Sequence, residues 1–270
     1  MPDSWWLKFK RAQQHMIDIR AEVRRYTESD PYEFVRIKEP DSTQQVRFRL
    51  RITGQPDPML ATVIGDFVHN LRCALDHVIV AAVPKQERKN AGFPFSYVDI
   101  FEQDSTGEFM VEHDEARNTF ERSITGLDPA ARAILISAQP YWMGTNAHLS
   151  TLGIISRLDN ADKHRTLAVI GTAVRNLVAT ATAKGQTVQL VHRIDPRAFV
   201  EDGTVAGWNV PDYLTPSEVH MEYSATTVVH VKMTGVRGNE PRYSFPIGIT
   251  VVMALREVRR MLQHLEPFTR

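Results

Sequence analysis

The chain has 270 residues, of which 43% are apolar and 24% charged, values typical of a folded globular protein and not of a disordered one. Its 32 basic and 32 acidic residues balance, which excludes a protein that coats nucleic acid through an overall basic field but leaves room for a local basic cleft. The one cysteine, Cys73, excludes an intramolecular disulfide, so the fold has to rest on its core.

Neither a secretory signal nor a membrane span is predicted. The segment Met1–Lys10 lacks the basic start and apolar run of a signal peptide. The longest apolar stretches, such as Val78–Val83, are far shorter than the about 20 residues that cross a bilayer. We therefore expect a cytoplasmic protein without a membrane partner.

In the first third of the chain, the pattern predicts a helix, a strand and a second helix. The first helix is capped by Ser4 and ends at Asp30-Pro31. Its apolar residues form one stripe: Trp5, Phe9, Ala12, Met16, Ile19, Val23 and Tyr26. A strand is predicted where Val46, Phe48 and Leu50 alternate with Arg47, Arg49 and Arg51. A long helix over about 58–83 and an ordered loop with aromatic anchors at 92–97 follow.

Helices and then strands are predicted in the rest of the chain. Helices are expected around 113–124, from the Asp128-Pro129 start to about 139, and over about 146–162. Strands are expected at 187–192, 220–223 and 227–233, with turns at 184–185, 202–203 and 234–235. A closing amphipathic helix is marked by Val251, Leu255, Val258, Leu262 and Leu265. We predict an α+β fold with a mainly helical core over 1–165, a β-rich lobe over 166–245 and a C-terminal helix over 246–270 that packs back on the core.

The segment Gly65–His77 is the one most suggestive of function. At about 100° per residue, one side of this helix is apolar. The other side carries Asp66, His69, Asn70, Arg72, Cys73, Asp76 and His77. A solvated helix face usually carries strong helix formers such as Lys and Glu, whereas these side chains make hydrogen bonds of defined geometry. Two interpretations remain: a catalytic or ligand-binding face, or a network that only fixes the packing of this helix.

Spacing along this face predicts particular pairs. Arg72 and Asp76 are four residues apart and can form an ion pair. His69 lies on one line with Asp76, two turns away, as Asn70 does with His77. A carboxylate beside an imidazole can fix its tautomer and raise its pKa, so Asp76 is a candidate partner of His69.

A second polar cluster stands at 159–165 (DNADKHR), where a helix is predicted to end. Cations there complement the negative end of the helix dipole, which is a structural explanation for Lys163, His164 and Arg165. The functional alternative is that this turn faces the 65–77 helix and contributes these three residues as a substrate-binding group.

The string from Arg72 to His77, an arginine and a histidine separated by four residues, resembles the motif of the HEPN superfamily of helical proteins, many of which cleave RNA. The wider string His69–His77, together with Asp162–Arg165, resembles a group of uncharacterised bacterial proteins. The resemblance implies a HEPN-like bundle and a metal-independent endoribonuclease of toxin or defence type, with RNA as substrate and no cofactor; a toxin would have a cognate antitoxin. Cys73 departs from the polar residue that usually follows the arginine, and the β-rich stretch is foreign to a minimal HEPN bundle.

The resemblance also implies roles for the residues. His77 would be the general base on a ribose 2′-OH or the acid on the leaving oxygen, Arg72 would stabilise charge on the phosphate, and Asp76, His69 and Asn70 would complete the catalytic group. Residues five apart project roughly 140° from each other on a helix, so one chain does not easily bring Arg72 and His77 to one phosphate. We therefore expect a homodimer.

Two further hypotheses stay open. A metal-dependent hydrolase could use His69, Asp76, His77 and His164 as ligands, although neither HExxH nor paired CxxC is present. Cys73 could be a nucleophile beside a histidine, although a lone helix cysteine is usually a packing residue. The remaining alternative is a non-catalytic helical protein that binds an unknown partner.

Overall fold

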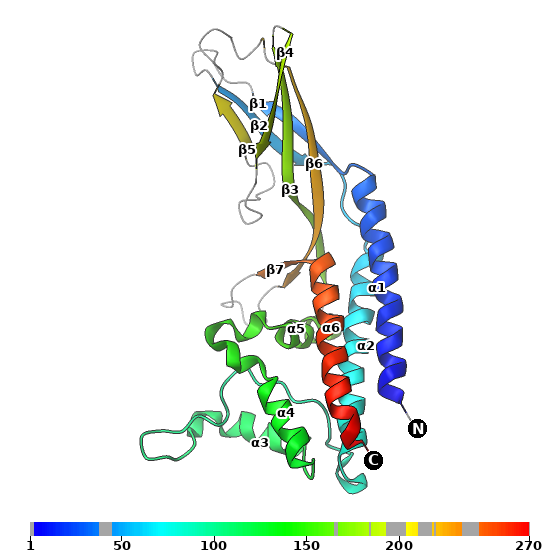
Figure 1. Ribbon diagram of the computed structural model, residues 1–270, viewed down its shortest axis with the longest axis vertical. Coiled ribbons are helices and arrows are strands. Elements are labelled where there is room, and N and C mark those ends of the chain that lie inside the picture. The colour runs from blue at the N-terminus through cyan, green and yellow to red at the C-terminus, as the bar shows by residue number, and fades with distance from the viewer. Residues whose placement is uncertain are drawn as a thin grey trace.

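The computed structural model describes residues 3–37, 45–164, 167–183, 185–192, 204–209, 218, 220–233 and 243–269. The α-helices in this part of the chain are α1 (Ser4–Glu28), α2 (Met59–Ala82), α3 (Asp114–Ser123), α4 (Pro129–Ser137), α5 (Thr151–His164) and α6 (Ile247–Leu265). The strands are β1 (Tyr32–Ile37), β2 (Gln45–Ile52), β3 (Ala168–Ala183), β4 (Gln186–His192), β5 (Thr204–Asn209), β6 (His220–Met233) and β7 (Tyr243–Pro246). The molecule is elongated, with the helices at one end and most of the strands at the other (Figure 1). The predicted α+β class is confirmed.

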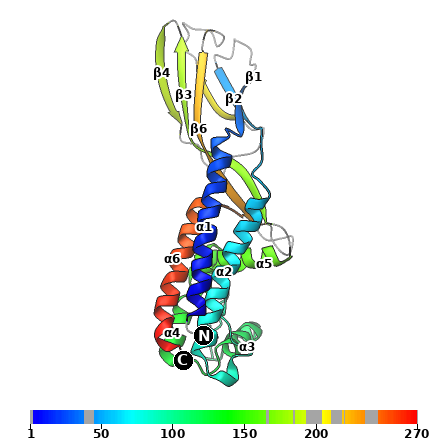
Figure 2. The same ribbon diagram turned by 90° about the vertical axis from the view of Figure 1, so that its right-hand side faces the viewer.

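Three helices form the centre of the helical end. α1, α2 and α6 run side by side, as two perpendicular views agree (Figure 2). The apolar stripe predicted for α1 packs into this core, and the five residues that predicted α6 are buried there. α2 is the most enclosed, with Phe67, Leu71 and Leu75 fully buried. The Trp6 Nε1–H donates to Glu266 Oε1 at 2.8 Å, which joins α1 to the segment after α6.

The ends of the helices differ in part from the predictions. Asp128 caps α4 as predicted, since its Oδ1 accepts from the Ala130 N–H at 2.8 Å. The prediction that Ser4 caps α1 was wrong. Ser4 is the first helical residue, Asp3 is at the N-cap position, and the side chain of Asp3 makes no capping hydrogen bond. The helix predicted from about 146 begins only at Thr151, because Pro140–Leu149 forms a 3-10 segment with a kink at Gly144, where φ is +55°.

Two antiparallel sheets make up the strand-bearing end. One has the order β1-β2-β5 and the other β4-β3-β6-β7, so strands before position 53 pair with strands after position 203. The strands predicted at 220–223 and 227–233 are one strand, β6, which pairs with β3. β2 is a strand as predicted, but the side chains at 46–50, on which the predicted buried and basic faces depend, are not among those described. The predicted turns at 202–203 and 234–235 also lie outside the described residues. Among the described residues, every helix falls short of the length or hydropathy that a bilayer span requires.

Candidate functional site

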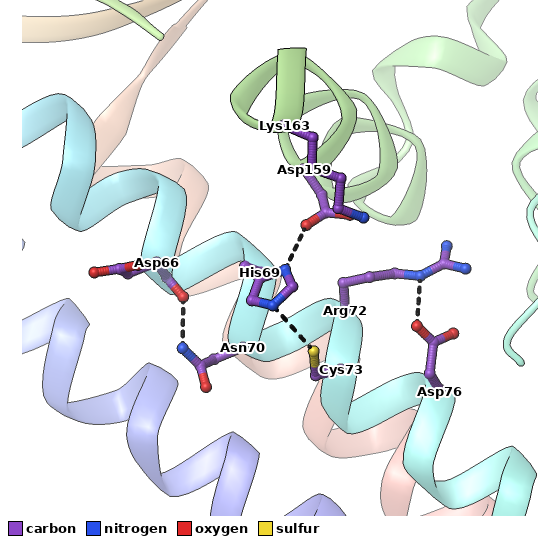
Figure 3. Close-up of polar contacts among 8 residues, drawn as sticks. All are labelled: Asp66, His69, Asn70, Arg72, Cys73, Asp76, Asp159 and Lys163. Carbon is purple, nitrogen blue, oxygen red and sulfur yellow. Dashed lines mark hydrogen bonds and ion pairs between the residues drawn. The ribbon is translucent and has the colours of Figure 1, made fainter. Parts of the chain in front are cut away.

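The polar face of α2 meets α5, which crosses it steeply (Figure 3). Gly65 allows the close approach, since a Cβ there would lie 2.2 Å from Asp162 Oδ1. The crossing brings together the two clusters that were separate in the sequence. His69 Nδ1 lies 3.1 Å from Asp159 Oδ1, and the Lys163 Nζ donates to Asp159 Oδ2 at 2.5 Å. We call His69, Cys73, Asp159 and Lys163 the dyad cluster, after the pair that His69 and Asp159 form at its centre.

The burial of the dyad cluster is uneven. The Asp159 side chain is only 3% exposed, whereas the His69 side chain is 48% exposed. A buried carboxylate next to Nδ1 favours the tautomer that carries its proton on Nδ1, and this leaves Nε2 as a proton acceptor on the open side. Lys163 is also 48% exposed and balances the charge of Asp159. The arrangement can therefore accept a proton and hold an anionic group beside a cation.

Cys73 lies on the open side of the imidazole. Its Sγ is 3.4 Å from His69 Nε2, one helical turn along α2 (Figure 3). Burial raises the pKa of the Cys73 thiol; Asp76 and Asp159 add to the rise, while Lys8 and Lys163 oppose it. The sulfur is therefore a thiol and not a thiolate at neutral pH.

Carboxylates surround the start of this face. Burial raises the pKa of Asp162, and the negative charges of Asp66 and Asp159 add to the rise. The Asn70 Nδ2–H donates to the Asp66 main-chain oxygen at 2.8 Å, so Asn70 bonds to its own helix. Neither Asn70 nor Asp66 contributes a side-chain bond to the His69–Asp159 pair.

The later part of the face holds the loop at 92–96, and we call Arg72, Asp76, Phe93 and Phe95 the loop cluster. The predicted ion pair forms, with Arg72 Nε donating to Asp76 Oδ2 at 3.0 Å. Asp76 Oδ1 accepts from the Phe93 N–H at 2.9 Å, and the Arg72 guanidinium lies 4.3 Å from the centre of the Phe95 ring. These contacts occupy both polar side chains. The loop is ordered with aromatic anchors, as predicted, since Phe93 is buried.

The structure does not bring Arg72 and His77 to one neighbour. His77 Nδ1 lies 3.2 Å from Ser4 Oγ on α1, while Arg72 is paired with Asp76. The predicted pairing of His69 with Asp76 is wrong, because α5 supplies the carboxylate from Asp159 and Asp76 is taken by Arg72. The His164 side chain and Arg165, two of the three predicted substrate-binding residues, lie outside the described residues. Among the described residues, no three His, Cys, Asp or Glu side chains are grouped so as to hold a metal ion.

Asp159 is the site residue that the sequence analysis did not single out. It lies on the buried stripe of α5 with Leu152, Ile155 and Ser156. A carboxylate on an otherwise buried helix stripe, four residues before a lysine, is a signal that could have identified it, since acidic side chains are seldom buried unless paired.

Comparisons of the chain with models of known protein families, with curated proteins and with solved structures gave no match.

Proposed function

We propose that the chain is a HEPN-like, metal-independent endoribonuclease whose general base is His69, oriented by Asp159, with Lys163 as the cation beside the phosphate. One observation carries the proposal: a half-exposed histidine whose Nδ1 is 3.1 Å from a buried carboxylate that also binds a lysine. A histidine that donates one ring N–H to a carboxylate and keeps a lone pair on the other nitrogen is a common general base near neutral pH.

The chemistry needs only groups of this chain and a proton from solvent. His69 Nε2 would take the proton of a ribose 2′-OH, and the 2′-oxygen would attack the neighbouring phosphorus. The bond from phosphorus to the 5′-oxygen then breaks, leaving a 2′,3′-cyclic phosphate, and the 5′-oxygen takes up a proton from solvent. Lys163 would balance the charge that grows on the phosphate oxygens. The Cys73 thiol, 3.4 Å from Nε2, would have to rotate away when RNA binds.

This proposal moves the general base from His77 to His69. Arg72 is engaged by Asp76 and stacked on Phe95, and His77 contacts Ser4, so neither turns toward the dyad cluster. One chain supplies His69, Asp159 and Lys163, so the proposed reaction needs no second copy. The homodimer, which followed from Arg72 and His77 alone, remains a separate prediction that sedimentation of the purified protein would test.

The test is RNA cleavage in EDTA. The purified chain should cut single-stranded RNA and leave 2′,3′-cyclic phosphate ends, and His69→Gln should lower the rate about 100-fold or more. His77→Gln on the same helix is the matched control and should retain the rate. The absence of cleavage with several RNAs, or equal rates for wild type and His69→Gln, would refute the proposal. Loss of cleavage in Arg72→Ala and His77→Gln, but not in His69→Gln, would instead support the paired motif in a dimer.

The second candidate function is a non-catalytic protein that binds a partner. The loop cluster favours this candidate, because Arg72 and Asp76 bind each other and Asp76 binds the Phe93 N–H, so both side chains fasten the loop to α2. This candidate predicts that changes along the face alter thermal stability and leave RNA intact.

A further inference from the structure

A thiol, an imidazole and a buried carboxylate stand in line across α2 and α5. Cys73 Sγ lies 3.4 Å from His69 Nε2, and His69 Nδ1 lies 3.1 Å from Asp159 Oδ1. The carboxylate stabilises a positively charged imidazole, so His69 can take the thiol proton as the sulfur reacts. The cysteine therefore has a hydrogen-bonding partner in His69 and is not an isolated packing residue.

The surroundings of Cys73 are partly open and carry charged side chains. Cys73 is only partly buried, and His69 beside it is 48% exposed. The charged groups near the sulfur are Lys8 from α1, Asp76 from α2, and Asp159 and Lys163 from α5. Because the chain has one cysteine, any disulfide at this position has to join it to another molecule.

We propose that Cys73 is a thiolation site that exchanges with small disulfides, with His69 as the proton acceptor. The Sγ–H proton passes to His69 Nε2, and the sulfur attacks one sulfur of the incoming disulfide. A new S–S bond forms as the old one breaks, and the leaving thiolate takes the proton from Nε2. Cys73 is oxidised, the leaving half of the reagent is reduced to a thiol, and no further oxidant is required.

Thiolation of Cys73 needs no RNA, so its test is independent of the test for ribonuclease activity. The experiment follows the mass of the intact protein during incubation with glutathione disulfide, and in parallel with the uncharged hydroxyethyl disulfide. Cys73→Ser has to abolish the adduct. His69→Gln should slow adduct formation at pH 7 about tenfold, since the rate depends on the fraction of reactive thiolate. His77→Gln, which changes a histidine of the same helix that contacts Ser4 while Cys73 contacts His69, should react like wild type.

A pH profile separates proton transfer from a structural effect. The wild-type rate should exceed the His69→Gln rate at neutral pH, and the two should converge at high pH, where the thiol is ionised without a proton acceptor. In guanidinium chloride all variants except Cys73→Ser should react alike. Equal rates and profiles for folded wild type and His69→Gln, or a folded wild type that gives no adduct with either reagent, would overturn the proposal.

Discussion

The dyad cluster and the loop cluster each pair an aspartate with a nitrogen-bearing side chain on the polar face of α2, and the two pairs serve different ends. In the loop cluster, Asp76 accepts from a main-chain N–H and from Arg72, so its polar groups are consumed in packing. In the dyad cluster, a side-chain carboxylate takes only one nitrogen of His69, and the other faces the Cys73 thiol at 3.4 Å. The partner of a polar side chain, more than its type, therefore decides whether it is free for chemistry.

The largest expected effect tests the dyad cluster. Asp159→Asn should lower RNA cleavage about 100-fold, because an amide can hold the imidazole in the wrong tautomer. The melting temperature should change little, since His69 and Lys163, the two side chains that lose their partner, are half exposed and can be hydrated. Cleavage assays and thermal unfolding of the same preparation check both points. A variant with full activity would remove Asp159 from the proposed mechanism.

The next effect tests the loop cluster. Asp76→Ala leaves the Phe93 N–H without its acceptor and Arg72 without its carboxylate. We expect a loss of about 2 kcal/mol in unfolding free energy, seen as a melting temperature lower by roughly 5 °C. Asp66→Ala, at an exposed position of the same helix, is the control and should be near neutral. If both variants melt like wild type, the loop cluster does not stabilise the fold.

A smaller effect is expected at His77. His77→Gln removes the contact of Nδ1 with Ser4 Oγ and should cost about 1 kcal/mol or less. Ser4→Ala should cost the same, and the double variant should cost no more than either single one, which a double-mutant cycle in urea would measure. Fully additive losses would show that the two side chains do not interact.

The smallest effect depends on pH. Because burial raises the pKa of Asp162 above its unfolded value, ionised Asp162 weakens the folded state at neutral pH, and protonation relieves this as the pH falls. Asp162→Asn should therefore raise the melting temperature slightly at pH 7, and the gain should vanish below about pH 4, the pKa range of an unfolded aspartate. A gain that persists at pH 3 would point to a cause other than charge.

The sequence predicted what local pattern controls and missed what tertiary contacts control. The stripes of α1, α2 and α6 and the Asp128 cap were predicted, since each depends on neighbours within a few turns. Periodicity could also say which side of α2 is polar. It could not say that Asp159 would replace Asp76 as the partner of His69, because the angle at which α5 crosses α2 depends on the close approach at Gly65. The strand β3 was missed altogether, because its small and β-branched residues alternate weakly.

The bond between Trp6 and Glu266 joins positions 260 residues apart, and α6 fills one side of a core that α1 and α2 begin. During synthesis, the apolar faces of α1 and α2 therefore leave the ribosome long before residues 247–265 can cover them. The nascent chain has to keep these faces from aggregating while it completes both sheets. A chain with such distant closing contacts should depend on chaperones more than a bundle with neighbouring helices does.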